Sequence, residues 1–332
     1  MTGGLQIAWV SIVIALSLPG PVGSAGQNQN PALGIAAAPT STTTDFKVTL
    51  LGTSTPNPRA DRFGPSTLVE AGGERLVFDC GRGCTIRLWQ LKIPLGTVKL
   101  FITHLHSDHI VGIPDLWLTG WLPQPYGTRK EAFRVWGPKG TEEMMSNLQK
   151  AYQEDLRIRR PSGQQAAIVA KDFTEGPVYD ENSVRVTAFK VKHGDNEEAY
   201  GFRVDYKGRS VVISGDMAPN ENFIKHAQGA DVVIHEVGAA RRELLEKSPA
   251  IRSLLATHHS SPEDAGKEFA RIKPKLAVYT HFSLFFGEGI SEVTVPEIIA
   301  RTRTTYSGPL EAGEDLMTIL IGDTVSVKHH TN

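Results

Sequence analysis

The sequence has no excess of charge of either sign and no long apolar run beyond its first 30 residues. Its 35 Lys and Arg residues nearly balance 36 Asp and Glu residues, so the formal net charge is −1. This balance gives no overall attraction to polyanions and argues against nucleic acid as a partner. The lack of a later apolar run excludes a transmembrane helix outside the N-terminal region. With 332 residues, 40% of them hydrophobic, the chain can bury a core, and we expect one domain over residues 46–332.

Cysteine is scarce, and the only two are Cys80 and Cys84. Two cysteines this close in an exported protein could form a small disulfide loop. They flank a glycine-containing turn, and the distance between their Cα atoms does not follow from the sequence. We predict two buried thiols in preference to a disulfide.

An apolar run, Leu5–Leu18, stands near the N-terminus and is followed by Pro, Gly and small residues. Its length suits the core of a signal peptide and is short for a bilayer span. No Lys or Arg precedes it, which departs from the usual signal-peptide pattern. We expect residues 1–25 to be a signal peptide, with an uncleaved N-terminal anchor or a misassigned start as alternatives. Residues 26–45 lack periodicity and predict a flexible linker, and the expected location is secreted or periplasmic.

A ten-residue stretch that begins at Phe101 carries three histidines and one aspartate within six positions. They are His104, His106, Asp108 and His109. The preceding apolar residues indicate a buried strand, so the motif lies on the loop at the C-terminal end of that strand. Alternate residues of an extended loop face the same way, so the first two histidines can converge on one metal ion and the other two residues on a second. Imidazole and carboxylate ligands suit zinc, with iron or manganese as alternatives. Polar loop residues without a metal are the competing interpretation, which this spacing disfavours.

This motif resembles that of the metallo-β-lactamase superfamily, and three further ligand-type residues, each after an apolar β-branched run, complete the resemblance. They are His193, Asp216 and His281. The resemblance covers roughly residues 46 to 325 and implies an α/β fold, an αββα sandwich of two mixed β-sheets with helices outside and the metal site along one edge. It also implies two zinc ions per chain. By resemblance, the ligands of one are His104, His106 and His193, those of the other are Asp108, His109 and His281, and Asp216 bridges them.

Two glycine-containing segments, Leu51–Thr53 and Phe78–Gly83, are similar to the ribonuclease Z branch of this superfamily. That branch joins tRNA 3′-processing endonucleases to secreted arylsulfatases and small phosphodiesterases. His259 lies in a His-Ser-Ser sequence that resembles the His-Ser-Thr element of the branch. The resemblance implies that it contacts a substrate oxyanion and protonates the leaving group, with the adjacent His258 as the alternative. The Gly-Pro-x-Gly-Thr sequence of Gly137–Thr141, which opens an expected helix, and the Asp155 and Arg159 that follow look like the arylsulfatase-type members.

The most aromatic segment, residues 112–127, follows the metal-binding motif. Trp117 and Trp121 share one face of an expected helix by their i,i+4 spacing. We predict that they bind substrate as an aromatic wall beside the metals. Ordinary packing of this helix on the sheet is the alternative.

Two metal ions make bound water nucleophilic at neutral pH, so the predicted reaction is hydrolysis, with Asp108, Asp216 and His259 as the catalytic side chains. The first hypothesis is an exported hydrolase of small anionic sulfate or phosphate esters. A tRNA 3′ endonuclease of the ribonuclease Z type is the alternative. The 22 residues between His193 and Asp216 are filled by an expected hairpin and leave no room for the tRNA-gripping arm that such enzymes generally carry. A lactonase or β-lactamase-like hydrolase and an inactive metal-binding protein remain further alternatives. The oligomeric state stays open between a monomer and a homodimer.

Overall fold

The computed structural model describes residues 45–125, 127–195 and 198–330. The expected signal peptide and all of the expected linker before Asp45 lie outside the described residues. No helix among the described residues is long and apolar enough to cross a membrane.

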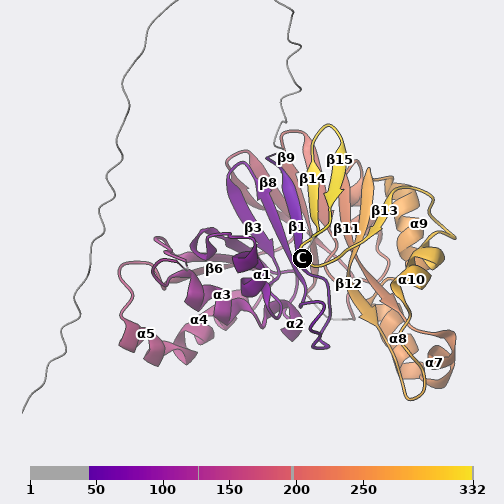
Figure 1. The fold of residues 1–332 in the computed structure, drawn as a ribbon, viewed down its shortest axis with the longest axis horizontal. Helices are drawn as coiled ribbons and strands as arrows, with labels where there is room; N and C mark the ends of the chain where they lie inside the picture. Colours follow the sequence, from indigo (N-terminus) through magenta and orange to yellow (C-terminus); the bar gives the residue numbers. More distant parts are fainter. Residues whose placement is uncertain (1–44, 126, 196–197, 331–332) are drawn as a thin grey trace, which may run out of the picture. The chain divides into compact units, whose positions relative to one another are not determined.

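Two mixed β-sheets form the centre of the fold (Figure 1). The first sheet has the order β15-β14-β1-β2-β3-β4-β5-β6 and the second β13-β12-β11-β10-β9-β8-β7. The strands of the first sheet are β1 (Lys47–Gly52), β2 (Ser66–Ala71), β3 (Glu74–Phe78), β4 (Lys99–Phe101), β5 (Phe133–Gly137), β6 (Ile168–Asp172), β14 (Thr318–Ile321) and β15 (Val325–Lys328). Those of the second are β7 (Gly176–Glu181), β8 (Val184–Lys190), β9 (Tyr200–Tyr206), β10 (Arg209–Ile213), β11 (Val232–Ala239), β12 (Leu276–Leu284) and β13 (Leu310–Ala312).

Helices flank the two sheets, as the sandwich architecture requires (Figure 1). Those of the first half are α1 (Cys84–Gln90), the 3₁₀-helix η1 (Leu95–Thr97), α2 (Ser107–Ile110), α3 (Ile113–Gly120), α4 (Thr141–Ala151) and α5 (Gln153–Arg159). Those of the second half are α6 (Glu221–Ala227), α7 (Arg242–Lys247), α8 (Pro249–His258), α9 (Pro262–Ile272) and α10 (Val295–Thr302). One apolar cluster joins the two sheets, a second joins the second sheet to its helices, and a third joins the first sheet to its helices. The predicted αββα sandwich is confirmed.

The expected hairpins form where glycine allows the tight turn. Gly72 and Gly73, between β2 and β3, have φ angles of 58° and 82°. Lys207 and Gly208, between β9 and β10, have φ angles of 49° and 73°. Positive φ at both central residues is the geometry that matches the twist of paired strands. The single hairpin β9–β10 accordingly stands between the segments that carry His193 and Asp216.

Stacked aromatic rings fill the space between the sheets. The buried Phe101 ring lies 4.8 Å from the Trp136 ring and 5.2 Å from the Phe78 ring, centroid to centroid. We expect Phe101→Ala to lower the free energy of unfolding by about 3–5 kcal/mol, because it removes a buried ring and leaves a cavity. Urea unfolding measures this change, and Val169→Ala at an exposed position serves as control. Equal stability of the two variants would contradict this packing.

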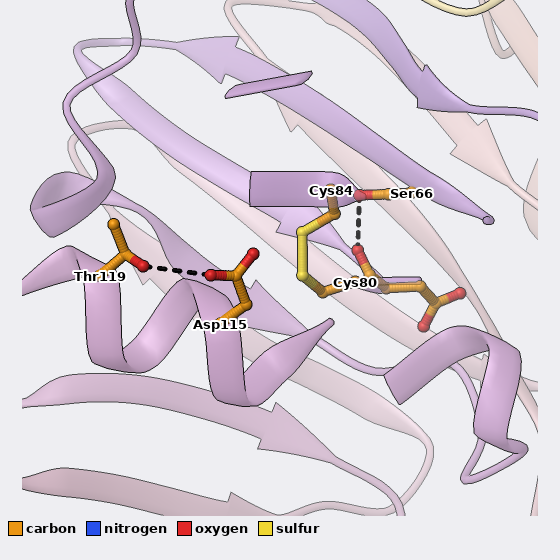
Figure 2. The surroundings of a disulfide bond; sticks show 6 residues. Ser66, Cys80, Cys84, Asp115 and Thr119 are labelled. Carbon is orange, nitrogen blue, oxygen red and sulfur yellow. Dashed lines mark hydrogen bonds between the residues drawn. A yellow bond between two sulfur atoms is a disulfide. The ribbon is translucent and has the colours of Figure 1, made fainter. Parts of the chain in front are cut away.

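The prediction of two free thiols is wrong, because Cys80 and Cys84 form a disulfide (Figure 2). Their Cα atoms lie 5.4 Å apart, inside the range that a disulfide spans. The intervening turn explains the proximity. Gly83 adopts a φ of 85° at the start of α1, and the amide of Cys84 donates to the carbonyl of Gly81.

Removing this disulfide is expected to lower the free energy of unfolding by about 2 kcal/mol, the value that loop entropy gives for so short a loop. A double Cys80→Ser/Cys84→Ser variant tests it by urea unfolding. The wild-type protein with and without reductant is the matched control. A reductant that leaves the wild-type midpoint unchanged, with both thiols then free, would refute a stabilising role.

Candidate metal centre

Eight ligand-type side chains from distant segments converge at one edge of the sandwich. Four groups have ligand atoms within 4.8 Å of one another. They are His104 with His106 and His193, Asp108 with His109 and His281, His104 with His109 and Asp216, and Asp216 with His259 and His281. The structure therefore brings together every metal ligand predicted from the sequence. The two separate triads with Asp216 beside both offer two adjoining metal positions.

Strand ends deliver these ligands. The loop after β4 carries His104 and His106, and the short helix α2 that follows carries Asp108 and His109. The segments after β8 and β10 carry His193 and Asp216. His281 lies inside β12 and has a φ of 43°. The pairing of β11 with β12 shifts register at this residue, because Glu236 pairs with Thr280 and Val237 with Phe282. His281 is thus the bulged residue, and a bulge re-aims a side chain next to an active site.

Hydrogen bonds made by the Nδ1 atoms orient several of the imidazoles. His109 Nδ1 donates to Asp79 Oδ2 at 2.8 Å, and His193 Nδ1 donates to the carbonyl of His258 at 2.8 Å. His104 Nδ1 lies 3.0 Å from the hydroxyl of Thr103. Such partners fix the ring and leave Nε2 for a metal.

The donor set fits divalent metal. The Nε2 atoms of His104 and His109 are buried and lack any hydrogen-bond partner among the described residues. Burying polar nitrogens without a partner is costly, and a metal ion would satisfy them. His193 Nε2 lies 3.2 Å from His106 Nδ1. Tetrahedral zinc with bonds of about 2.0–2.1 Å holds neighbouring nitrogens roughly 3.3 Å apart.

The pKa shifts of His104 and Asp216 suit ligation. Burial holds the pKa of His104 well below its ordinary value of 6.5, so this imidazole is neutral at pH 7. Burial raises the pKa of the Asp216 carboxyl, but the imidazoles of His281 and His109 outweigh it and hold the pKa well below 3.8. Neutral imidazole and ionised carboxylate are the forms that bind metal. Burial lowers the pKa of His109, but the charges of Asp216 and Asp79 outweigh it and raise the pKa well above 6.5, so a bound cation would have to displace that proton.

Asp79 is not a ligand but orients residues of the centre by hydrogen bonds, and sequence reasoning missed it. Its carboxylate accepts from His109 Nδ1, from the backbone amide of Thr103 and from the Thr103 hydroxyl, at 2.8 Å in each case. It directly precedes Cys80, and its backbone carbonyl accepts from the hydroxyl of Ser66. Its position in the Phe-Asp-Cys-Gly turn was the available signal.

His259 approaches the same edge and pairs with a carboxylate that sequence reasoning also missed. His259 Nδ1 lies 3.2 Å from Glu236 Oε2, and the other oxygen of Glu236 accepts from the backbone amide of Ser260. A Cβ at Gly238 would lie 2.6 Å from that of His259, so glycine permits this close approach. Burial lowers the pKa of His259, but the charge of Glu236 outweighs it and raises the pKa above 6.5. Glu236 therefore orients the imidazole and favours its protonated form.

A cavity of about 320 Å³ opens over these residues. The predicted metal ligands among its lining residues are His106, Asp108, His193, Asp216 and His281. The other lining residues are Thr55, Pro56, Asn57, Leu254, His258, His259, Ser283, Leu284, Phe285 and Phe286. Both histidines of the His258–His259 pair thus face it, the alternative that the sequence left open.

Trp117 and Trp121 do not line this cavity, and their prediction as substrate-binding residues is corrected to packing. Both side chains are buried. Trp117 belongs to the cluster between the first sheet and its helices, and its indole nitrogen donates to the carbonyl of Ala166 at 3.0 Å. The i,i+4 spacing therefore marked buried packing positions on α3 and on the residue directly after it.

Comparison with known proteins agrees with this geometry. Residues 74–282 match the model of the beta-lactamase superfamily domain. A ribonuclease Z of Mycobacterium bovis is 32% identical over 277 residues, which is 82% of this chain and 96% of that protein. A ribonuclease Z of Mycobacterium avium is 34% identical over 281 residues, again 82% of this chain and 96% of that protein.

Solved structures share the fold. The metallo-beta-lactamase fold protein YhfI of Bacillus subtilis aligns with a TM-score of 0.62 at 17% identity, over 82% of this chain and 98% of that chain. The short form of human tRNase Z aligns with a TM-score of 0.59 at 24% identity, over the same shares of both chains. The chain therefore belongs to the metallo-β-lactamase superfamily and, within it, is a homologue of the ribonuclease Z proteins.

Proposed function

We propose that this protein is a phosphodiesterase that uses two zinc ions. The observation that carries the proposal is the pair of ligand triads with Asp216 beside both and the Glu236–His259 pair at the cavity. Bound zinc supplies a water-derived nucleophile at neutral pH and stabilises negative charge. His259 lies where it can donate a proton to the leaving oxygen, and Glu236 holds its ring in place.

Endonucleolytic cleavage of RNA near its 3′ end is the first candidate reaction. The relatives named ribonuclease Z support it, because this chain spans almost their whole length. The Glu236–His259 pair supports it as well, since a positioned proton donor suits the poor leaving group of an RNA phosphodiester. The comparisons thus favour the reaction that the sequence placed second.

Hydrolysis of a small phosphate or sulfate ester is the second candidate, and the cavity favours it. No Lys or Arg is among the described residues that line the cavity, although RNA-binding grooves are usually basic. The hairpin β9–β10 stands where an RNA-gripping arm would be needed. Export of the protein also belongs to this proposal. The apolar run Leu5–Leu18 suits a signal peptide, and the Cys80–Cys84 disulfide suits an oxidising compartment.

A matched substrate set tests the proposal. Zinc-loaded protein is offered a phosphate diester, a phosphate monoester, a sulfate monoester, a lactone and a precursor tRNA. We expect a phosphate diester or the tRNA to be cleaved fastest. A preference for the lactone or the sulfate would overturn the proposed phosphodiesterase, and sequencing of the mature N-terminus, expected near residue 26, tests export.

A further inference from the structure

Several residues that line the metal-centre cavity are large and apolar, and nothing in the metal chemistry requires them. We call Leu254, Leu284, Phe285 and Phe286 the apolar wall; all four line the cavity. Leu254 is 38% exposed and Phe286 is 56% exposed. Large apolar side chains left in solvent beside a reactive centre indicate a ligand that covers them.

Local structure holds the apolar wall in place. Leu254 lies on α8, whose last residue, His258, accepts the hydrogen bond from His193 Nδ1. The amide of Phe285 donates to the carbonyl of Ala239 at 2.9 Å. The amides and carbonyls of Gly287 and Ile290 are paired at 3.0 Å, which closes a tight turn directly after Phe286. These bonds hold the backbone that carries Phe285 and Phe286.

The apolar wall adjoins the proton donor. The ring of Phe285 lies 6.2 Å from the ring of His259, centroid to centroid. When His259 protonates the leaving oxygen of a substrate, the part of the leaving group bonded to that oxygen therefore lies against the apolar wall. The cavity of about 320 Å³ is near the lower end of the roughly 300–1,000 Å³ of small-ligand sites. It suits the ester group and one ring.

We propose that the apolar wall binds a planar aromatic group on the leaving side of the substrate. The inference rests on the proposed phosphodiesterase and names its substrate class, a diester whose leaving oxygen is attached to an aryl ring or to a nucleoside. Aryl rings and nucleobases share the flat apolar face that stacks on phenylalanine. The ring binds by contact with the wall, and the metal centre binds the phosphate.

Matched diesters test this wall. Methyl phenyl phosphate is compared with methyl hexafluoroisopropyl phosphate, whose leaving alcohol has similar acidity but no ring. We expect wild type to prefer the phenyl ester by about tenfold in kcat/KM, and Phe286→Ala to remove the preference by slowing only the phenyl ester. Phe286→Tyr, which keeps the ring, should retain the preference for the phenyl ester. Ile158→Ala, at an exposed apolar position of α5, should behave like wild type.

A second experiment, with RNA substrates, distinguishes the two sources of the ring. Oligonucleotides carry either a purine or an abasic site on the nucleotide that holds the leaving oxygen. A selective loss for the purine substrate in Phe286→Ala identifies a nucleobase, and a selective loss for the phenyl ester identifies an aryl group. Equal rates for all variants on ring and ring-free substrates would overturn the proposal.

Inhibitor binding separates this proposal from the proposed reaction. Phenylphosphonate and methylphosphonate are titrated calorimetrically into the zinc-loaded protein. We expect phenylphosphonate to bind about tenfold more tightly to wild type and to lose that advantage in Phe286→Ala. Equal affinities would refute the wall even if diesters are cleaved. A clear difference between the two affinities, in a protein that cleaves no diester, would refute the proposed reaction and support the apolar wall as a binding site.

Discussion

An Asp216→Ala variant is expected to lose hydrolysis and at least one metal ion per chain. Asp216 Oδ2 lies 3.5 Å from His109 Nε2 and 3.2 Å from His281 Nε2, and it is buried among the other ligands. Without Asp216, Asp108 is the one carboxylate left among the predicted ligands, and imidazoles carry no negative charge to balance a second cation. The loss in kcat/KM should exceed the roughly 10- to 100-fold cost of changing an outer hydrogen-bond partner. His106→Ala should act in the same direction.

Metal analysis alongside diester turnover measures this effect. Asp323→Ala is the matched control, because this aspartate is fully exposed on the turn between β14 and β15. It should keep wild-type metal content and rate. An Asp216→Ala protein with its full metal content and undiminished turnover would show that the centre has been assigned to the wrong residues.

The second large effect is expected at His259. His259→Ala should lower kcat by roughly 10²- to 10⁴-fold, the usual contribution of a positioned proton donor. Its metal content should stay the same, because both ligand triads are complete without it. His258→Ala is the control that resolves which histidine of the pair acts. A larger loss in His258→Ala than in His259→Ala would reverse the assignment.

The pH profile tests the partner of His259. A proton donor works below its own pKa, so kcat/KM falls as the pH rises through that pKa. Burial lowers the pKa of His259 and the charge of Glu236 raises it to a net value above 6.5. Glu236→Gln removes the charge, so the fall in rate should move to lower pH. An unmoved profile in Glu236→Gln would mean that Glu236 has only a structural role.

The metal ligands could be predicted from sequence because each follows a β-branched apolar run. His104 follows β4 of the first sheet and Asp216 follows β10 of the second, so the packing of the two sheets brings them together although more than 100 residues separate them. The hairpin turns at Gly72 and Gly208 were likewise readable from the need for positive φ.

Residues that act through other side chains could not be predicted. Glu236 reaches His259 only because β11 lies beside the end of α8, and strand Asp231–Glu236 reads as plain core in the sequence. Trp117 lies on the buried face of α3, and helical spacing alone does not tell a buried face from a cavity. The Cys80–Cys84 bond depends on the left-handed conformation of Gly83, which sequence permits but does not dictate.

The central claim is that catalysis depends on two metal ions bound at one edge of the sandwich. Titrating metal-stripped protein with Zn²⁺, while bound zinc and diester hydrolysis are measured together, tests it most directly. The account predicts that hydrolysis rises to a plateau at two zinc ions per chain and stays near zero in Asp216→Ala. Full hydrolysis in the metal-stripped protein, or a plateau at one zinc ion, would contradict it.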